Sequence, residues 1–181
     1  MRINLSHCAL IIGSLMILLS GSALIWPASA RKIARGFSRN TAAAWTLVII
    51  DMVWSAWLVH NEPMPRFEQY KSWLFILTPG LIVMIIFLME ELLAARALGG
   101  LMLLAASPIL TAVRFNDSSW RIFMTLIGYT MVLAGIMLVL SPFRLRKGAE
   151  WLSVSRFRWQ AASIAVLLIG ATALLSGVFA Y

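Results

Sequence analysis

Charged side chains are scarce in this chain. Of its 181 residues only 12% are Asp, Glu, Lys or Arg, which is about half of the share in a typical soluble domain. Hydrophobic residues make up 61%. A soluble domain cannot hide so much apolar surface from water, and a disordered chain has low hydrophobicity and high charge. The composition therefore excludes a soluble enzyme, a soluble nucleic-acid binder and a disordered protein, and it predicts an all-α integral membrane protein.

Residue types that often bind metals or act as nucleophiles are also few. There is one cysteine, Cys8, so no intrachain disulfide can form. The two histidines, His7 and His60, stand in no metal-ligand spacing. The sequence contains no nucleophile elbow, phosphate-binding loop, dinucleotide fingerprint or zinc-protease helix. We therefore predict a protein that is not an enzyme and that uses no metal and no cofactor.

Long apolar runs account for most of the chain. A bilayer core requires about 20 mostly apolar residues per helix. The run 73–115 is too long for one such helix, and its charged residues and paired glycines predict a turn near Leu92–Gly100. We expect a single membrane domain over residues 1–181, with six transmembrane helices at about 5–26, 41–60, 73–92, 97–115, 121–140 and 159–181.

The first apolar run has an alternative interpretation as a signal peptide. Ala28, Ser29 and Ala30 follow it with the small-residue spacing of a cleavage site. However, the run is longer than the apolar core of a usual signal peptide, and cleavage would leave a basic segment on the translocated side, against the positive-inside rule. We therefore expect the first helix to be retained.

The basic residues are unevenly divided between the two sides of the predicted bundle. The loops after the first, third and fifth helices carry ten of the 15, namely Arg31, Lys32, Arg35, Arg39, Arg96, Arg144, Arg146, Lys147, Arg156 and Arg158. Cytoplasmic loops are enriched in Lys and Arg, so we expect these loops in the cytoplasm and both termini outside. The net charge of +8 then reflects topology and not a nucleic-acid partner, and the expected location is the bacterial cytoplasmic (inner) membrane.

The first and last basic loops resemble each other. Pro27 and Pro142 are each followed by a basic pair four and five residues later, then by a serine and a tryptophan. Either the first two and the last two helices form a parallel repeat, or the pattern is that of any cytoplasmic helix end. In both cases we expect short amphipathic helices that bind anionic lipid headgroups, at about 1 kcal/mol per basic residue. The expected lipid-contacting residues are Arg31, Lys32, Arg35, Arg39, Arg144, Arg146 and Lys147.

An acidic residue, Asp51, stands in the middle of the second predicted helix. A carboxylate at the bilayer centre costs roughly 2.5–3.5 kcal/mol, so this side chain should face protein or water and not lipid. Trp54 and Ser55 lie on the same helical face and can offer hydrogen bonds. Two interpretations stay open: a proton or cation site, or a neutral acid that hydrogen-bonds across helices.

Glu90, Glu91 and Arg96 form a second polar candidate at the end of the third predicted helix. Arg96 is close enough in sequence to pair with one of the glutamates, so we expect an interfacial salt bridge. In the alternative, Glu90 joins Asp51 as a carboxylate pair for a metal or proton path. That alternative is weaker, because the two side chains would differ in depth by half a bilayer.

The stretch Ala94–Leu101, taken with the two hairpins in which basic residues follow a proline, resembles multi-pass membrane proteins of bacteria. The resemblance implies no function and no site residues. We expect a non-enzymatic scaffold, accessory or lipid-contacting protein that acts as a homodimer or with a membrane-protein partner. The alternative is a small proton- or cation-coupled transporter or channel subunit that uses Asp51.

Overall fold

The structure is a computed structural model that describes residues 5–61, 71–88, 93–116, 118 and 120–179. Within these residues the chain is helical apart from short connections, and it contains no strand. The predicted all-α class is therefore confirmed for the part of the chain that the structure describes.

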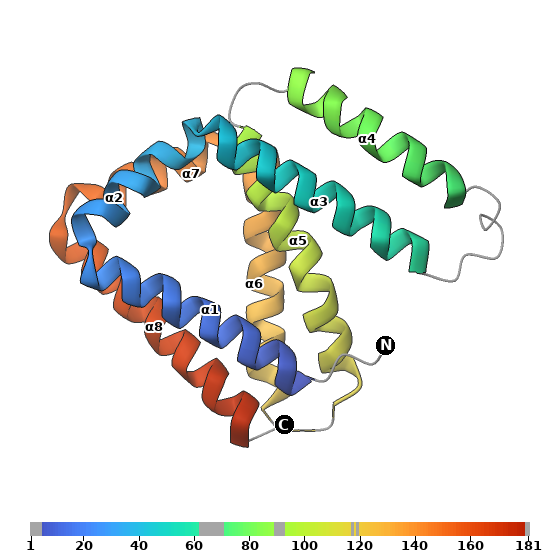
Figure 1. The fold of residues 1–181 in the computed structure, drawn as a ribbon. Coiled ribbons are helices and arrows are strands. Elements are labelled where there is room, and N and C mark those ends of the chain that lie inside the picture. The colour runs from blue at the N-terminus through green and yellow to red at the C-terminus, as the bar shows by residue number, and fades with distance from the viewer. Residues whose placement is uncertain (1–4, 62–70, 89–92, 117, 119, 180–181) are drawn as a thin grey trace.

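Long apolar helices are interrupted by two short basic ones (Figure 1). The long helices are α1 (Leu5–Ile25), α3 (Thr41–Asn61), α4 (Lys71–Leu88), α5 (Leu93–Arg114), α6 (Arg121–Leu140) and α8 (Arg156–Phe179). The short ones are α2 (Pro27–Gly36) and α7 (Phe143–Val154), and one turn of 3-10 helix, η1 (Phe37–Arg39), leads from α2 to α3. By length and composition, α1, α3, α5, α6 and α8 can each cross a membrane, whereas α4 has only a shorter apolar stretch, Leu77–Phe87. These five apolar helices suggest a multi-pass membrane protein.

The turn predicted near Leu92–Gly100 is wrong over residues 93–100, because these residues are helical. Helix α5 begins at Leu93 and runs through both glycines. The reason is a close contact between helices. A methyl group on Gly99 would lie 2.8 Å from the carbonyl oxygen of Gly135 in α6. Gly99 therefore allows two backbones to approach, and it does not change the direction of the chain.

Two antiparallel helix pairs are packed through glycines. In the α1–α8 pair, a methyl group on Gly13 would lie 2.7 Å from the backbone nitrogen of Leu174. At the other end of the same pair, the indole nitrogen of Trp159 donates a hydrogen bond of 3.2 Å to the carbonyl oxygen of Ala23. The α5–α6 pair has the Gly99–Gly135 contact described above. Small residues at these crossings let the backbones come close, so that many atom pairs reach van der Waals distance.

The two pairs converge at one end of the molecule, where α1 begins and α8 ends (Figure 1). A buried apolar core fills this end, formed by Leu5, Cys8, Ala9, Ile109, Ala112, Val113, Met124, Ile127 and Ala173. At the opposite end α2 and α7 lie side by side (Figure 1). Helix α3 packs on α5 through a second, smaller core, and α4 lies on the outer side of α3 (Figure 1). The two short basic helices, which come from opposite halves of the sequence, are thus brought together at one end of the fold.

Candidate functional site

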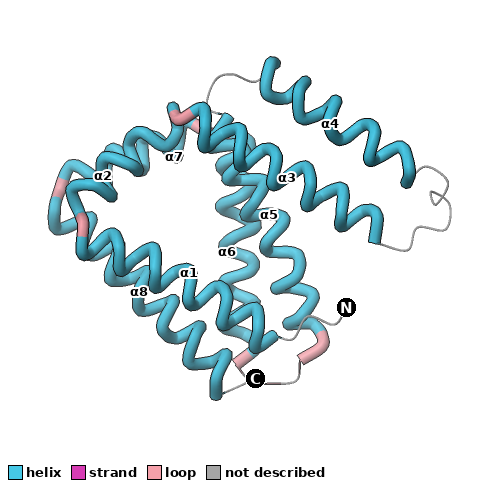
Figure 2. The backbone as a smooth tube through the Cα atoms, in the orientation of Figure 1, coloured by secondary structure: helices cyan, strands magenta, loops and turns pink. Residues whose placement is uncertain are grey.

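Helices α2 and α7 are short because prolines and a residue with extended backbone separate them from the long helices. Pro27 is the first residue of α2, where its missing N–H and fixed φ are tolerated. Pro142 precedes the first residue of α7, and the extended backbone of Ser155 ends that helix before α8 begins. Figure 2 shows the loop residues at each of these corners. Two segments that the sequence analysis predicted to be short helices are therefore helical.

A direct hydrogen bond joins the two short helices. The Nη2 of Arg35 in α2 donates to the carbonyl oxygen of Ser153 in α7 at 2.8 Å, across 118 positions of sequence. Ser153 is buried, and its hydroxyl donates to the carbonyl oxygen of Ala149 within α7. Bonds to a charged donor are among the stronger hydrogen bonds. The basic loops therefore form one surface, which we call the basic platform, α2 together with α7.

The α2 side of the platform is both cationic and apolar. A shallow hollow in its surface is lined by Ala28, Arg31, Lys32 and Arg35. On another face of the same helix the side chain of Ile33 is 68% exposed. Exposed apolar and basic side chains on one short helix are typical of helices that lie in a membrane interface. The backbone of Arg39 lies in η1, and its side chain is outside what the structure describes.

On the α7 side of the platform, two of the three cations contact other side chains of the same helix. Arg146 Nε lies 3.3 Å from Glu150 Oε1, one turn along the helix. The ammonium of Lys147 stands 5.4 Å from the centre of the Phe143 ring, within cation–π range. Arg144 is exposed. The two halves of the platform thus differ in how much of their positive charge is balanced locally.

Asp51 lies in a second region, at the contact between α3 and α5. It shares a buried face of α3 with Ala44 and Val48, and its side chain is only 8% exposed. The residue opposite is Gly100, where a methyl group would stand 2.8 Å from Asp51 Oδ2. Asp51 Oδ1 is buried and has no hydrogen-bond partner among the described residues. The carboxyl group therefore faces another helix, with one oxygen unsatisfied.

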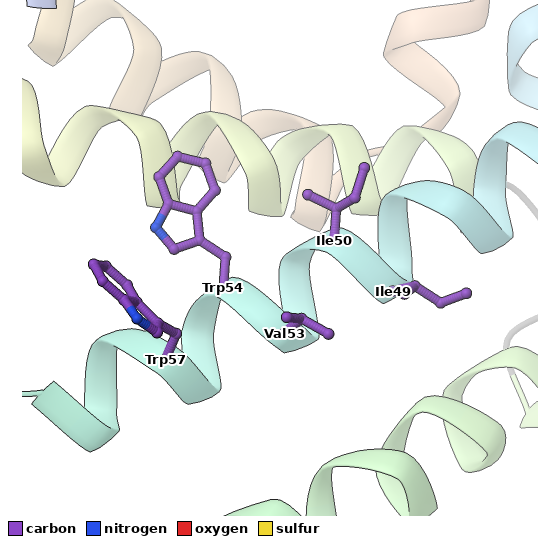
Figure 3. Close-up of a pocket in the computed structure, with 5 residues that line it drawn as sticks. All are labelled: Ile49, Ile50, Val53, Trp54 and Trp57. Carbon is purple, nitrogen blue, oxygen red and sulfur yellow. The ribbon is translucent and has the colours of Figure 1, made fainter.

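Trp54 and Ser55 do not meet the Asp51 carboxyl. The Ser55 hydroxyl donates to the carbonyl oxygen of Met52 in its own helix at 3.0 Å. Trp54 lines an apolar hollow together with Ile49, Ile50, Val53 and Trp57, all projecting from one side of α3 (Figure 3). Because successive helical residues are 100° apart, Asp51 lies on a different side of α3 from this hollow.

The predicted pairing of Arg96 with a neighbouring glutamate is not tested, since Glu90 and Glu91 lie outside the described residues. Arg96 itself is partly buried near the start of α5, and its Nε is buried without a hydrogen-bond partner within the described ranges. It stands one turn before Gly100, so it shares a face of α5 with the residue that contacts Asp51. Sequence reasoning assigned Gly100 to a turn and so missed its contact with Asp51.

No metal centre is evident in the part of the chain that the structure describes. There, no group of three or more His, Cys, Asp or Glu side chains is placed to hold an ion.

Comparisons with protein-family models, curated proteins and solved structures each return no match for this chain. The basic platform and Asp51 are therefore the two features of the described residues that point to a function.

Proposed function

We propose that this chain is a non-enzymatic, multi-pass membrane protein of scaffold or accessory type that contacts anionic lipid through the basic platform. One observation carries the proposal: α2 and α7 come from distant parts of the sequence and are joined by the hydrogen bond from Arg35 to Ser153. Because the two basic helices are packed together, their positive charges lie on one continuous surface. Two separate loops would instead form two smaller charged surfaces.

The location of the platform supports contact with headgroups. α2 follows the apolar helix α1 directly, with Trp26 64% exposed at the corner. Tryptophan is enriched at the boundary between hydrocarbon and headgroups. Each basic residue near an anionic membrane surface contributes about 1 kcal/mol of attraction, and this falls off within a Debye length. The platform combines several such residues on a surface that also exposes apolar side chains.

The number of membrane spans and their orientation are also part of what we propose. We take α4 as a sixth span and place the platform in the cytoplasm of a bacterial cell, at its inner membrane, with both termini outside. The uneven distribution of basic residues supports this orientation. The order of a long, a short and a long helix occurs twice, as α1–α2–α3 and α6–α7–α8, and a parallel repeat is the proposed reason. A second copy or another membrane protein is the proposed partner.

Lipid selection tests the proposed function. The protein would be reconstituted into vesicles of equal phosphatidylglycerol and phosphatidylcholine, extracted in mild detergent, and its retained lipids quantified. We expect phosphatidylglycerol to be enriched. Changing the basic residues of the platform to Gln should abolish the enrichment; the six are Arg31, Lys32, Arg35, Arg144, Arg146 and Lys147. A control variant with Arg114→Gln and Arg121→Gln, outside the platform, should keep it. Enrichment that survives in the platform variant contradicts the proposal.

A second candidate function is favoured by the unsatisfied oxygen of Asp51. Buried polar groups are normally hydrogen-bonded, and acidic residues inside membranes often mark proton or ion paths. In this alternative the protein is a proton- or cation-coupled transporter or channel subunit. Asp51→Asn keeps the size of the side chain and removes its charge. If the alternative holds, proteoliposomes show a proton flux that the variant abolishes while its assembly stays normal. The lipid-contacting function expects no such flux in either protein.

A further inference from the structure

The hollow on α2 has the composition of a site for a phosphate group. It is lined by four residues of one helix: Ala28, Arg31, Lys32 and Arg35. Counted from Ala28, the three cations follow at three, four and seven residues. At 3.6 residues per turn these positions fall on a single face. Three cations therefore surround one depression, and the small side chain of Ala28 leaves space at its end.

Two of the three cations are already held in place. Arg31 Nε donates to the carbonyl oxygen of Pro27 at 3.0 Å, and Arg35 Nη2 donates to the carbonyl oxygen of Ser153 at 2.8 Å. A guanidinium has five N–H groups, so each arginine retains further donors after making its bond. Side chains that are ordered before binding lose less conformational entropy when a ligand arrives. The hollow is thus a preorganised set of donors.

The contrast with α7 shows what is missing from the α2 hollow. Arg146 of α7 is paired with Glu150, and Lys147 rests over the Phe143 ring. Within the described ranges, no acidic side chain pairs with Arg31, Lys32 or Arg35. These three charges are therefore not balanced by an acidic side chain of the described residues, and they are available to an external anion. A phosphate group fits, because its oxygens accept several charge-assisted hydrogen bonds at once.

We propose that the α2 hollow binds the phosphate of one anionic phospholipid. The source is assigned to lipid because the hollow begins one turn beyond the apolar helix α1, on a short helix that follows the exposed Trp26 and that exposes Ile33 on another face. The proposal rests on the proposed lipid-contacting function and adds a defined site to it. The basic platform as a whole attracts anionic lipid by its net charge, whereas the hollow on α2 holds one headgroup by direct hydrogen bonds.

The test compares two variants that remove the same charge from the same platform. One changes Arg31, Lys32 and Arg35 to Gln, and the other changes Arg144, Arg146 and Lys147 to Gln. Delipidated full-length protein in a neutral detergent would be titrated with phosphatidylglycerol, and bound lipid would be counted by native mass spectrometry. Phosphatidylcholine and inorganic phosphate serve as the comparison ligands.

We expect the wild-type protein to bind one phosphatidylglycerol ahead of any others. The α2 variant should bind this first lipid about a hundredfold more weakly, since three basic residues are removed, while the α7 variant binds it nearly as well as the wild type does. Inorganic phosphate and phosphatidylcholine should not compete at the same concentrations. Melting curves of both variants in the same detergent check that each is folded.

Three outcomes would overturn the proposal of a phospholipid site. Equal weakening in the two variants would mean diffuse attraction to the platform, and the proposed function would stand without a site. No weakening in either variant would contradict both the site and the lipid-contacting function. Full competition by inorganic phosphate would keep the anion site but remove phospholipid as its occupant.

Discussion

Gly99 and Gly100 are neighbours in α5, and they meet very different partners on two faces of that helix. A methyl group on Gly99 would lie 2.8 Å from the backbone oxygen of Gly135 in α6. A methyl group on Gly100 would lie at the same distance from a side-chain oxygen of Asp51 in α3. The first partner is a backbone atom of a packed helix, while the second is the end of a side chain that can rotate. The α5–α6 contact is therefore rigid, and the α3–α5 contact can adjust.

The α3–α5 contact is also unusual in that it buries a polar atom without a hydrogen-bond partner. The core in which α3 meets α5 is apolar, formed by Ala44, Val48, Leu93, Ala94 and Ala97. Asp51 extends the buried face of α3 with a carboxyl group that has one unsatisfied oxygen. An apolar residue there would bury no unpaired polar atom. Packing alone does not account for an acid at this position, which is why the second candidate function is worth testing.

The largest effect in this comparison is expected for Gly99→Ala. The added methyl group meets a backbone oxygen that cannot move without shifting α6, and overpacking of this kind costs about 1–3 kcal/mol. Unfolding of the purified protein in mixed detergent micelles would measure the loss. Gly21→Ala in α1 is the matched control, since nothing lies within 4 Å of its added methyl group. The control should be unchanged or slightly more stable, because Ala favours a helix over Gly. Equal stability in the two variants would refute the close α5–α6 contact.

An effect of opposite sign is expected for Asp51→Ala. This change removes a buried oxygen without a partner and adds no bulk toward Gly100, so the protein should gain about 1 kcal/mol in the same unfolding assay. Val48→Ala, on the same buried face, should lose stability because it removes only apolar packing. A large loss in Asp51→Ala would mean that the carboxyl group makes a stabilising interaction, and the structural account of this interface would then be wrong.

The smallest effect is expected for Gly100→Ala. The Asp51 carboxyl can rotate away from the new methyl group, so the net change should stay below about 1 kcal/mol. Combining the substitution with Asp51→Ala sharpens the test, since any remaining cost should vanish when the carboxyl is absent. A cost that persists in the double variant would show that the methyl group clashes with something other than Asp51.

Several features of the molecule follow from sequence patterns that act locally. Apolar runs of about 20 residues predict helices wherever they occur, because backbone polar groups in a membrane can only be satisfied internally. Pro27 and Pro142 predict helix boundaries, because a proline inside a helix lacks an N–H and clashes with the preceding turn. The basic residues that follow each proline predict short helices with one charged face. α2 begins at Pro27 and α7 directly after Pro142, and both are short helices with basic residues.

The sequence on its own determined the class of the protein, the approximate positions of its helices and the oddity of Asp51, because these depend on composition and on spacing along one chain. Tertiary structure alone decided that α1 pairs with α8, that Arg35 reaches Ser153, and that Gly100 faces Asp51. A helical pattern defines which side chains share a face, but it does not identify the helix that covers that face. For the same reason, the paired glycines predict a turn from sequence alone, whereas in the fold they lie inside α5 and face α6 and α3.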